Sequence, residues 1–284
     1  MSTRTGRLIT LACLSFLTVA LTACSASAPA SRVALTPGTS WQWQLGGGAV
    51  DETVLDDVVN AKKMYDIDLF TNDAATIDRL HAKGITVICY METGAVENYR
   101  PDAARYPAAV LGEGVDGYPD ERFVDIRRID VLLPILTARL DLALSKGCDG
   151  IEPDLDDTYG SATGFPLTQV DQLAFNRAVA DAAHARGLSI GLKNGASPDS
   201  SFERAMAEFT DWALNEECNT FDECSGYSVF IDRNKAVFQV EYMSPNGTQV
   251  ADFCPADNAA NFDGLLKESS GSLAALPRVA CRIG

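Results

Sequence analysis

The segment KGCDGIEPD, residues 146–154, joins the end of a helix through a glycine to a short apolar strand. A basic residue suits the negative end of a helix dipole, and glycine takes the left-handed conformation that ends many helices. The same pattern recurs in KGITVICY, residues 83–90, and in RGLSIGLK, residues 186–193. Repeated helix–glycine–strand units predict an α/β protein with a parallel sheet.

Eight segments have the length and composition of strands. They are Trp41–Leu45, Met64–Phe70, Ile85–Met91, Arg122–Ile126, Gly150–Asp154, Leu188–Lys193, Trp212–Glu216 and Lys235–Tyr242. This number predicts a single (β/α)8 TIM-type barrel, which we place at residues 41–284 because no second linker interrupts them. A doubly wound sheet is the alternative, but no glycine-rich phosphate-binding pattern follows the first strand.

The N-terminus is typical of an export signal. A basic start and the apolar run Leu8–Leu21, too short to span a bilayer, lead to Leu21-Thr-Ala-Cys24. This resembles a bacterial lipobox, so residues 1–23 are predicted to be a lipoprotein signal peptide and Cys24 the lipidated residue. The alternative is a plain secretory peptide cleaved near Ala28 or Ala30. Both interpretations predict an exported protein; with Cys24 lipidated, it would be held at the bacterial cell surface by that anchor alone.

Residues 24–40 are rich in Ser, Ala, Thr and Pro and are predicted to form a flexible tether. Six cysteines remain beyond the signal region: Cys89, Cys148, Cys218, Cys224, Cys254 and Cys281. Export permits disulfides, and an even number fits three bridges. The two cysteines closest in sequence flank a short loop and are the easiest pair to close, and the last two share the C-terminal tail. The first two lie beside predicted strands and could form a bridge or remain as buried thiols.

The net charge of the chain indicates which classes of partner it can bind. The chain has 39 Asp and Glu against 23 Lys and Arg, a formal net charge of −16. Such a protein repels phosphate backbones, so we expect no nucleic-acid partner and favour neutral or cationic ligands. The two histidines, His81 and His184, lie near predicted helix ends. A histidine zinc site or a Ser-His-Asp triad is therefore not expected, and we expect neither metal nor cofactor in what we take to be a monomer.

Polar residues end most of the predicted strands: Asp66, Asp68, Tyr90, Glu92, Asp125, Glu152, Asp154, Lys193, Asn194, Asn215, Glu216, Glu241 and Tyr242. A barrel core would not tolerate so many charges, but the C-terminal rim of a barrel collects them at one mouth. Carboxylate pairs without a nucleophilic Ser or Cys indicate glycoside hydrolysis. Each carboxylate taken alone could instead cap a loop, and residues 154–157 could bind calcium, although they lack the glycine and terminal glutamate of an EF-hand.

Taken together, these segments resemble glycoside hydrolase family 114, the endo-α-1,4-polygalactosaminidase-like proteins. The matching stretches are Trp41-Gln-Trp-Gln-Leu45, Tyr65-Asp-Ile-Asp68, Val87-Ile-Cys-Tyr90, Arg100-Pro-Asp102, Gly147-Cys-Asp-Gly-Ile-Glu-Pro-Asp154, Gly191-Leu-Lys-Asn194, Asn215-Glu-Glu-Cys218, Glu223-Cys224 and Val240-Glu-Tyr242. The resemblance implies a TIM-type barrel and endo-hydrolysis of α-1,4-linked galactosamine-containing polysaccharide. It also implies catalysis by an Asp and a Glu, carried here by Asp154 as nucleophile and Glu216 as general acid/base.

The remaining rim residues are predicted to bind the substrate: Trp41, Asp68, Tyr90, Glu92, Glu152, Lys193, Asn194, Glu241 and Tyr242. Aromatic rings can stack on sugar faces, whereas Trp43 and Trp212 are predicted to pack in the core. The acidic rim favours a cationic polymer. Two rival functions are a non-catalytic glycan-binding lipoprotein, which would need no carboxylate pair, and a metal-dependent polysaccharide deacetylase, which the absence of strand-end histidines disfavours.

Overall fold

The computed structural model describes residues 1, 32–46, 48, 50, 62–243, 248–269 and 271–282. Apart from Met1, the predicted signal peptide, Cys24 and the first part of the tether lie outside the described residues. Among the residues described, no helix combines the length and the apolar character that crossing a bilayer requires.

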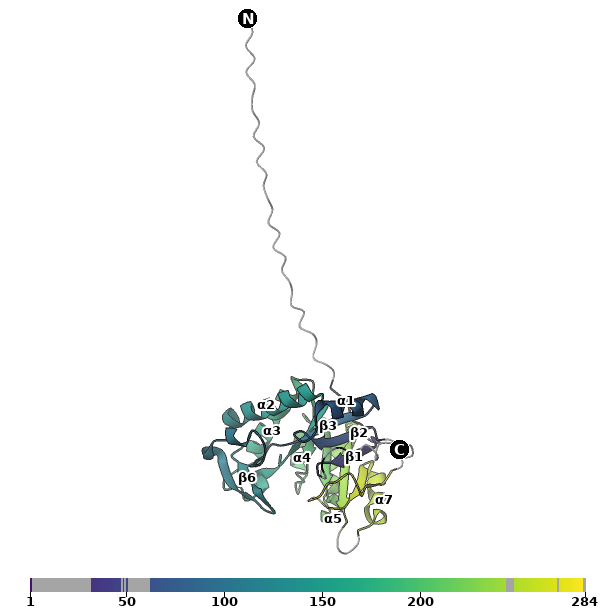
Figure 1. The fold of residues 1–284 in the computed structure, drawn as a ribbon. Helices are drawn as coiled ribbons and strands as arrows, with labels where there is room; N and C mark the ends of the chain where they lie inside the picture. Colours follow the sequence, from purple (N-terminus) through teal and green to yellow (C-terminus); the bar gives the residue numbers. More distant parts are fainter. Residues whose placement is uncertain are drawn as a thin grey trace.

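A curled, mainly parallel sheet forms the centre of the fold (Figure 1). Its strands, in spatial order, are β1 (Trp41–Gln44), β2 (Met64–Asp68), β3 (Thr86–Glu92), β7 (Gly150–Asp154), β8 (Ser189–Lys193), β9 (Trp212–Glu216), β10 (Val237–Tyr242), β11 (Asp263–Lys267) and β12 (Val279–Ala280). Strands β1 to β11 of this sheet run parallel, and β12 pairs antiparallel with β11. The parallel strands therefore bring their C-terminal ends to one edge.

The α/β class is confirmed, but two details of the prediction are wrong. The predicted strand Arg122–Ile126 overlaps β6 (Tyr118–Val124), which belongs to a separate sheet with β4 (Ala95–Glu97) and β5 (Leu111–Val115). Residues 118–122 of this strand are mostly exposed, whereas Phe123 and Val124 are buried, as suits an antiparallel sheet that is partly solvated. The prediction missed β11, because its sequence DGLLK opens with a turn signal and has no β-branched residue. The prediction also lacked the antiparallel β12, so within the described residues the main sheet has nine strands where eight were predicted.

Helices connect the parallel strands. They are α1 (Ala74–Ala82), α2 (Ile129–Lys146), α3 (Gln169–His184), α4 (Ser201–Met206), α5 (Cys218–Phe221), α6 (Ser228–Ile231) and α7 (Val250–Ala260), with short 3₁₀ turns η3 (Ala103–Arg105), η4 (Ala108–Val110), η5 (Thr158–Gly160) and η6 (Cys224–Tyr227). Helix α2 ends at Gly147 in the left-handed conformation, as its sequence predicts. A capping box formed by Thr168 and Asp171 begins α3.

Two apolar layers hold the sheet. One lies between the sheet and the helices, and the other is the aromatic cluster of Trp41, Trp43, Trp212 and Phe238 inside the curl. The ring centroids of Trp41 and Phe238 are 4.8 Å apart. The Trp41 indole Nε1 also donates to the backbone oxygen of Asp263 at 2.8 Å, which links β1 to β11. In Figure 1 the C-terminal segment with α7 accordingly lies beside β1.

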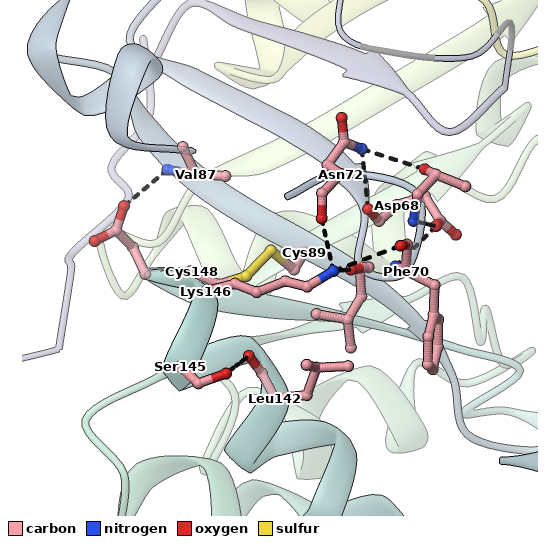
Figure 2. Close-up of a disulfide and its surroundings, with 12 residues drawn as sticks. Asp68, Phe70, Asn72, Val87, Cys89, Leu142, Ser145, Lys146 and Cys148 are labelled. Atoms are coloured by element: carbon pink, nitrogen blue, oxygen red, sulfur yellow. Dashed lines mark hydrogen bonds between the residues drawn. A yellow bond between two sulfur atoms is a disulfide. The ribbon is translucent and has the colours of Figure 1, made fainter. Parts of the chain in front are cut away.

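The structure contains three disulfides, Cys89–Cys148, Cys218–Cys224 and Cys254–Cys281. The predicted 218–224 bridge is confirmed, and the first pair forms a bridge rather than two free thiols. That bridge joins β3 to the segment between α2 and β7 (Figure 2).

Beside the first disulfide, Lys146 Nζ donates to the backbone oxygens of Leu69 and Asn72 at 2.7 and 2.6 Å (Figure 2). The side chain of Asn72 in turn donates to the backbone oxygen of Asp68 at 3.0 Å. Asp68 accepts the backbone N–H of Phe70 with Oδ1 at 2.9 Å. This network fixes the end of β2, where the functional edge of the sheet begins.

Candidate active site

A pocket of about 380 Å³ opens at the C-terminal edge of the parallel strands. Its lining residues are Trp43, Leu45, Gly46, Asp68, Tyr90, Glu97, Tyr99, Arg100, Val115, Tyr118, Glu121, Asp154, Leu155, Lys193, Asn194, Glu216, Gly271, Ser272 and Leu273. Six strands of the main sheet and the three-stranded sheet contribute to it. This is the edge at which parallel α/β enzymes carry their sites.

Lys193, the last residue of β8, lies at the centre of a cluster of charged side chains in this pocket. Its Nζ is 3.0 Å from Glu152 Oε1, 3.3 Å from Asp154 Oδ1 and 3.2 Å from Glu216 Oε2. Burial alone would lower the pKa of Lys193, but the surrounding carboxylates, that of Asp154 first, outweigh it and raise the pKa well above the ordinary value. The side chain is therefore an ammonium ion shared by three carboxylates.

Two of these three carboxylates can be reached from the pocket. The side chains of Asp154 and Glu216 are 24% and 20% exposed, whereas that of Glu152 is fully buried. One oxygen of Asp154 lies 3.3 Å from the Lys193 nitrogen, and one oxygen of Glu216 lies 3.2 Å from the same nitrogen. The distance between these two oxygens therefore cannot exceed the sum of the two distances. The predicted catalytic pair is thus brought together around one cation.

Neutral donors complete the environment of the pair. Tyr90 Oη donates to Asp154 Oδ2 at 2.9 Å, and the backbone N–H of Leu155 donates to Asp154 Oδ1 at 3.0 Å. Asn194 Nδ2 donates to Glu216 Oε2 at 3.0 Å, and the Tyr242 hydroxyl donates to Glu216 Oε1. Each carboxylate is therefore held in one orientation by donors from neighbouring strands.

The residues predicted to bind substrate separate into two groups. Asp68, Tyr90, Lys193 and Asn194 line the pocket. Trp41, Glu92, Glu152, Glu241 and Tyr242 are not among its lining residues, within the part of the chain that the structure describes. Asp68 is itself occupied by Arg100, whose Nη2 lies 2.6 Å from Asp68 Oδ2.

Three residues of the second group have clear structural partners. Glu92 Oε1 accepts the backbone N–H groups of Gly94 and Ala95 at 2.9 and 3.0 Å and so holds the turn after β3. Burial raises the pKa of Glu92 well above its ordinary value, with Asp154 and Glu97 adding to the effect. Glu241 accepts from Asn219 N at 3.0 Å, from Thr220 Oγ1 at 2.6 Å and from Gln239 Nε2 at 2.7 Å. Trp41 packs in the aromatic cluster.

The three-stranded sheet brings residues that the sequence did not single out to the pocket: Glu97, Tyr99, Arg100, Tyr118 and Glu121. Arg100 Nε donates to Glu97 Oε2 at 2.7 Å, and Tyr99 Oη donates to Glu97 Oε1 at 2.6 Å. Glu121 faces Glu97 across the β4–β6 ladder. Burial, followed by Glu97 and Asp154, raises the pKa of Glu121 to about 7. Because residues 122–126 were assigned to the barrel, the sequence analysis did not predict that a separate three-stranded sheet lines the pocket.

Metal coordination is the remaining aspect of the site. Within the described residues, no group of three or more His, Cys, Asp or Glu side chains is arranged to hold a metal ion. The chemistry that the described side chains offer is that of two accessible carboxylates around an ammonium ion.

Comparison with known proteins places this site in a family. Residues 22–280 match the model of glycoside-hydrolase family GH114. The crystal structure of Ega3 from Aspergillus fumigatus in complex with galactosamine is 34% identical in sequence, with a TM-score of 0.76, and the match covers 87% of this chain and 98% of that chain. No curated protein sequence matches the chain.

The glycoside hydrolase domain of PelA from Pseudomonas aeruginosa shares the fold, with a TM-score of 0.64 at 11% identity, and the match covers 85% of this chain and 98% of that domain. The family match is what assigns the chain, because it spans most of the sequence, including nearly all of the described residues. The chain is a glycoside hydrolase and belongs to glycoside-hydrolase family GH114.

Proposed function

We propose that the protein is an endo-glycosidase that hydrolyses α-1,4-linked galactosamine-containing polysaccharide, with Asp154 as nucleophile and Glu216 as general acid/base. The observation that carries this proposal is the position of Lys193, whose ammonium group contacts both accessible carboxylates at the pocket floor. The galactosamine bound in the structure of Ega3, a relative at 34% identity, supports the choice of sugar.

The contacts of the pair suggest a retaining reaction in two steps. Retaining glycosidases place their carboxyl groups about 5–5.5 Å apart and inverting ones about 6.5–9.5 Å apart, and the shared contact with Lys193 keeps the nearest oxygens of this pair no farther apart than the lower end of the inverting range. In the first step the Asp154 carboxylate forms a bond to the anomeric carbon. The glycosidic bond breaks, and protonated Glu216 gives its proton to the leaving oxygen. In the second step Glu216 takes a proton from water, which attacks the anomeric carbon and releases Asp154.

This assignment gives Lys193 a defined part. The first step moves one negative charge from Asp154 to Glu216, and the second step returns it. Because Nζ lies 3.3 Å from one carboxylate and 3.2 Å from the other, the same ammonium group can balance the charge in both states. Little reorganisation of the site is then needed as the charge moves, which is how preorganised electrostatics lower a barrier.

For the fold, we propose that the main sheet is a closed (β/α)8 barrel. Eight of its strands run parallel, and the hydrogen bond from Trp41 Nε1 to Asp263 O joins the first of these strands to the last. In such a barrel the aromatic cluster would fill the interior and the pocket would be its mouth.

For location, we propose an exported monomer held at the bacterial cell surface by lipid on Cys24. The three disulfides support export, because such bonds persist in oxidising compartments. Cys24→Ala should abolish lipid labelling and either release the protein or leave its precursor uncleaved. Lipid labelling that is unchanged in this variant would contradict the anchor.

The substrate prediction is tested with two polymers of one backbone, one with free amines and one fully N-acetylated. The net charge of −16 and the carboxylates at the pocket should attract the cationic polymer. Release of reducing ends from it should fall as salt rises, mainly through KM, because salt screens exposed charges. The acetylated polymer should show little salt effect. Equal salt sensitivity, or preference for the acetylated polymer at low salt, would mean that the acidity serves solubility alone.

A further inference from the structure

Asp66 is a buried acid for which the proposed reaction has no direct use. It lies in the middle of β2, where strand alternation puts it on the same face as Met64, a member of the aromatic cluster inside the curl. Its side chain is fully buried. Neither of its carboxyl oxygens accepts a hydrogen bond from any donor in the described part of the chain.

The neighbour of Asp66 is a second carboxyl group, that of Glu152 on β7, within hydrogen-bonding reach. Two carboxyl groups can bond to each other only if one of them carries a proton. Glu152 already accepts from Lys193 Nζ at 3.0 Å with Oε1 and from Trp43 Nε1 at 3.0 Å with Oε2. These two donors, one of them a cation, favour the ionised form of Glu152. Near Asp66 the only donor in the described part of the chain is the backbone N–H of Ile67, which favours the ionised form of Asp66 much less, so the proton belongs on Asp66.

We propose that Asp66 is held protonated in the native enzyme and donates a hydrogen bond to Glu152. Asp66, Glu152 and Lys193 then form an electrically neutral group directly beneath the catalytic pair. Asp66 is in this sense a positioning residue, which acts through Glu152 and Lys193 and never touches substrate. The protonation of Asp66 does not depend on the proposed function, whereas its role in catalysis rests on it.

The charges around Asp66 agree with this assignment. Burial is the largest influence, followed by the charge of Glu152, and together they raise the pKa of Asp66 well above its ordinary value, while Lys193 offsets only part of the effect. Its partners across the two neighbouring ladders, Trp43 and Ile88, carry no charge.

The consequence concerns how Lys193 is shared. An ionised Asp66 would add a second buried negative charge beside Glu152 and draw the ammonium group downward, away from the pocket. A protonated Asp66 instead disperses the charge of Glu152 through its hydrogen bond. The positive charge of Lys193 is then directed at Asp154 and Glu216, the two carboxylates that exchange a negative charge in the proposed reaction.

Infrared difference spectroscopy tests the proton directly. Asp66→Asn keeps the shape of the side chain and replaces the O–H donor with an amide N–H. The wild-type-minus-variant difference spectrum at neutral pH should contain one carbonyl stretch of a protonated carboxylic acid that Asp66→Asn lacks, whereas bands from other protonated acids such as Glu92 occur in both proteins and cancel. Asp73→Asn is the matched control: Asp73 is an exposed helix cap whose pKa its contacts with Thr76 lower, and asparagine caps equally well. A band that survives in Asp66→Asn but is lost in Glu152→Gln would overturn the assignment.

Stability against pH provides a second readout that does not depend on activity. At neutral pH the unfolded Asp66 is ionised and the folded one protonated, so folding must take up a proton. Asp66→Asn avoids this cost. It should therefore be more stable than wild type at pH 7, and the difference should shrink as the pH falls toward about 4, where the unfolded carboxyl also becomes protonated. A difference that grows toward acidic pH would mean that Asp66 is ionised in the fold.

Activity then separates positioning from mere packing. Asp66→Asn should keep kcat and its pH profile within about threefold of wild type, whereas Asp66→Ala, which leaves Glu152 without that donor, should lose about tenfold in kcat with little change in KM. Equal losses in both variants would reject the positioning role. If wild type hydrolyses no galactosamine polymer, the proposed substrate fails, while the infrared and stability results still decide the state of Asp66.

Discussion

Asp154→Asn and Glu216→Gln should each lower kcat by about 10³-fold or more while substrate binding survives, because the amide of Asn cannot form the glycosyl bond and that of Gln cannot give a proton. Reducing-end release measures the first quantity, and the affinity for a non-cleaved oligomer measures the second. Glu217→Gln is the matched control: it makes the same chemical change one residue from Glu216, at a side chain that is not among the pocket-lining residues within the described segments. Its activity should equal that of wild type.

The two roles can be told apart by rescue with azide. Azide should restore cleavage by Asp154→Ala and give a glycosyl azide of inverted configuration, since it takes the place of the missing nucleophile. With Glu216→Gln and a substrate that has a good leaving group, the azide product should keep its configuration, because Asp154 still forms the intermediate. The opposite pattern would mean that Glu216 is the nucleophile and Asp154 the general acid/base.

Near-normal activity in either amide variant would mean that other carboxylates carry the reaction. Glu152 and Glu241 are the next candidates by sequence, but their geometry is unfavourable. Glu152 is fully buried beneath Lys193, and the two carboxylate oxygens of Glu241 are engaged by three donors of its surroundings. A nucleophile needs a lone pair that is free to reach the anomeric carbon, and neither residue offers one at the pocket surface.

Periodicity and helix-end signals were sufficient to predict most of the parallel sheet. Residues 146–154 show why: a basic residue, a left-handed glycine and an apolar strand are all local features, and each has one favoured structure. The error at residues 122–126 has a different origin. A strand pattern gives the face that is buried but not the sheet that it joins, and pairing with β4 and β5 is a matter of distant contacts.

The same limit applies to the site. Strand-end position was enough to predict that Asp154, Lys193 and Glu216 lie together at one edge of the sheet, because parallel strands bring their ends to one edge. It could not separate them from Glu241 or Glu92, since whether a carboxylate faces the pocket or holds a loop depends on donors such as Thr220 Oγ1, which no spacing rule reveals. Nor could it find Glu121, which reaches the pocket from the separate three-stranded sheet.

Lys193→Met should lower kcat by about 10²-fold or more, because it removes the cation that balances the charge of the two proposed catalytic carboxylates. Lys63→Met, which removes the same charge from an exposed side chain, should leave kcat unchanged. Lys193→Arg should not rescue activity, because a planar guanidinium cannot replace a compact ammonium at three carboxylates 3.0–3.3 Å away.

Loss of folding must be separated from loss of catalysis in this variant. Removing Lys193 leaves Glu152 buried without its cation, which typically costs about 3–5 kcal/mol. The double change Lys193→Met with Glu152→Gln removes that uncompensated charge, so thermal stability should largely return. Activity should not, because Asp154 and Glu216 would still lack the ammonium between them. If the double variant recovers both stability and activity, Lys193 serves only to neutralise Glu152, and the charge exchange between the two catalytic carboxylates proceeds without it.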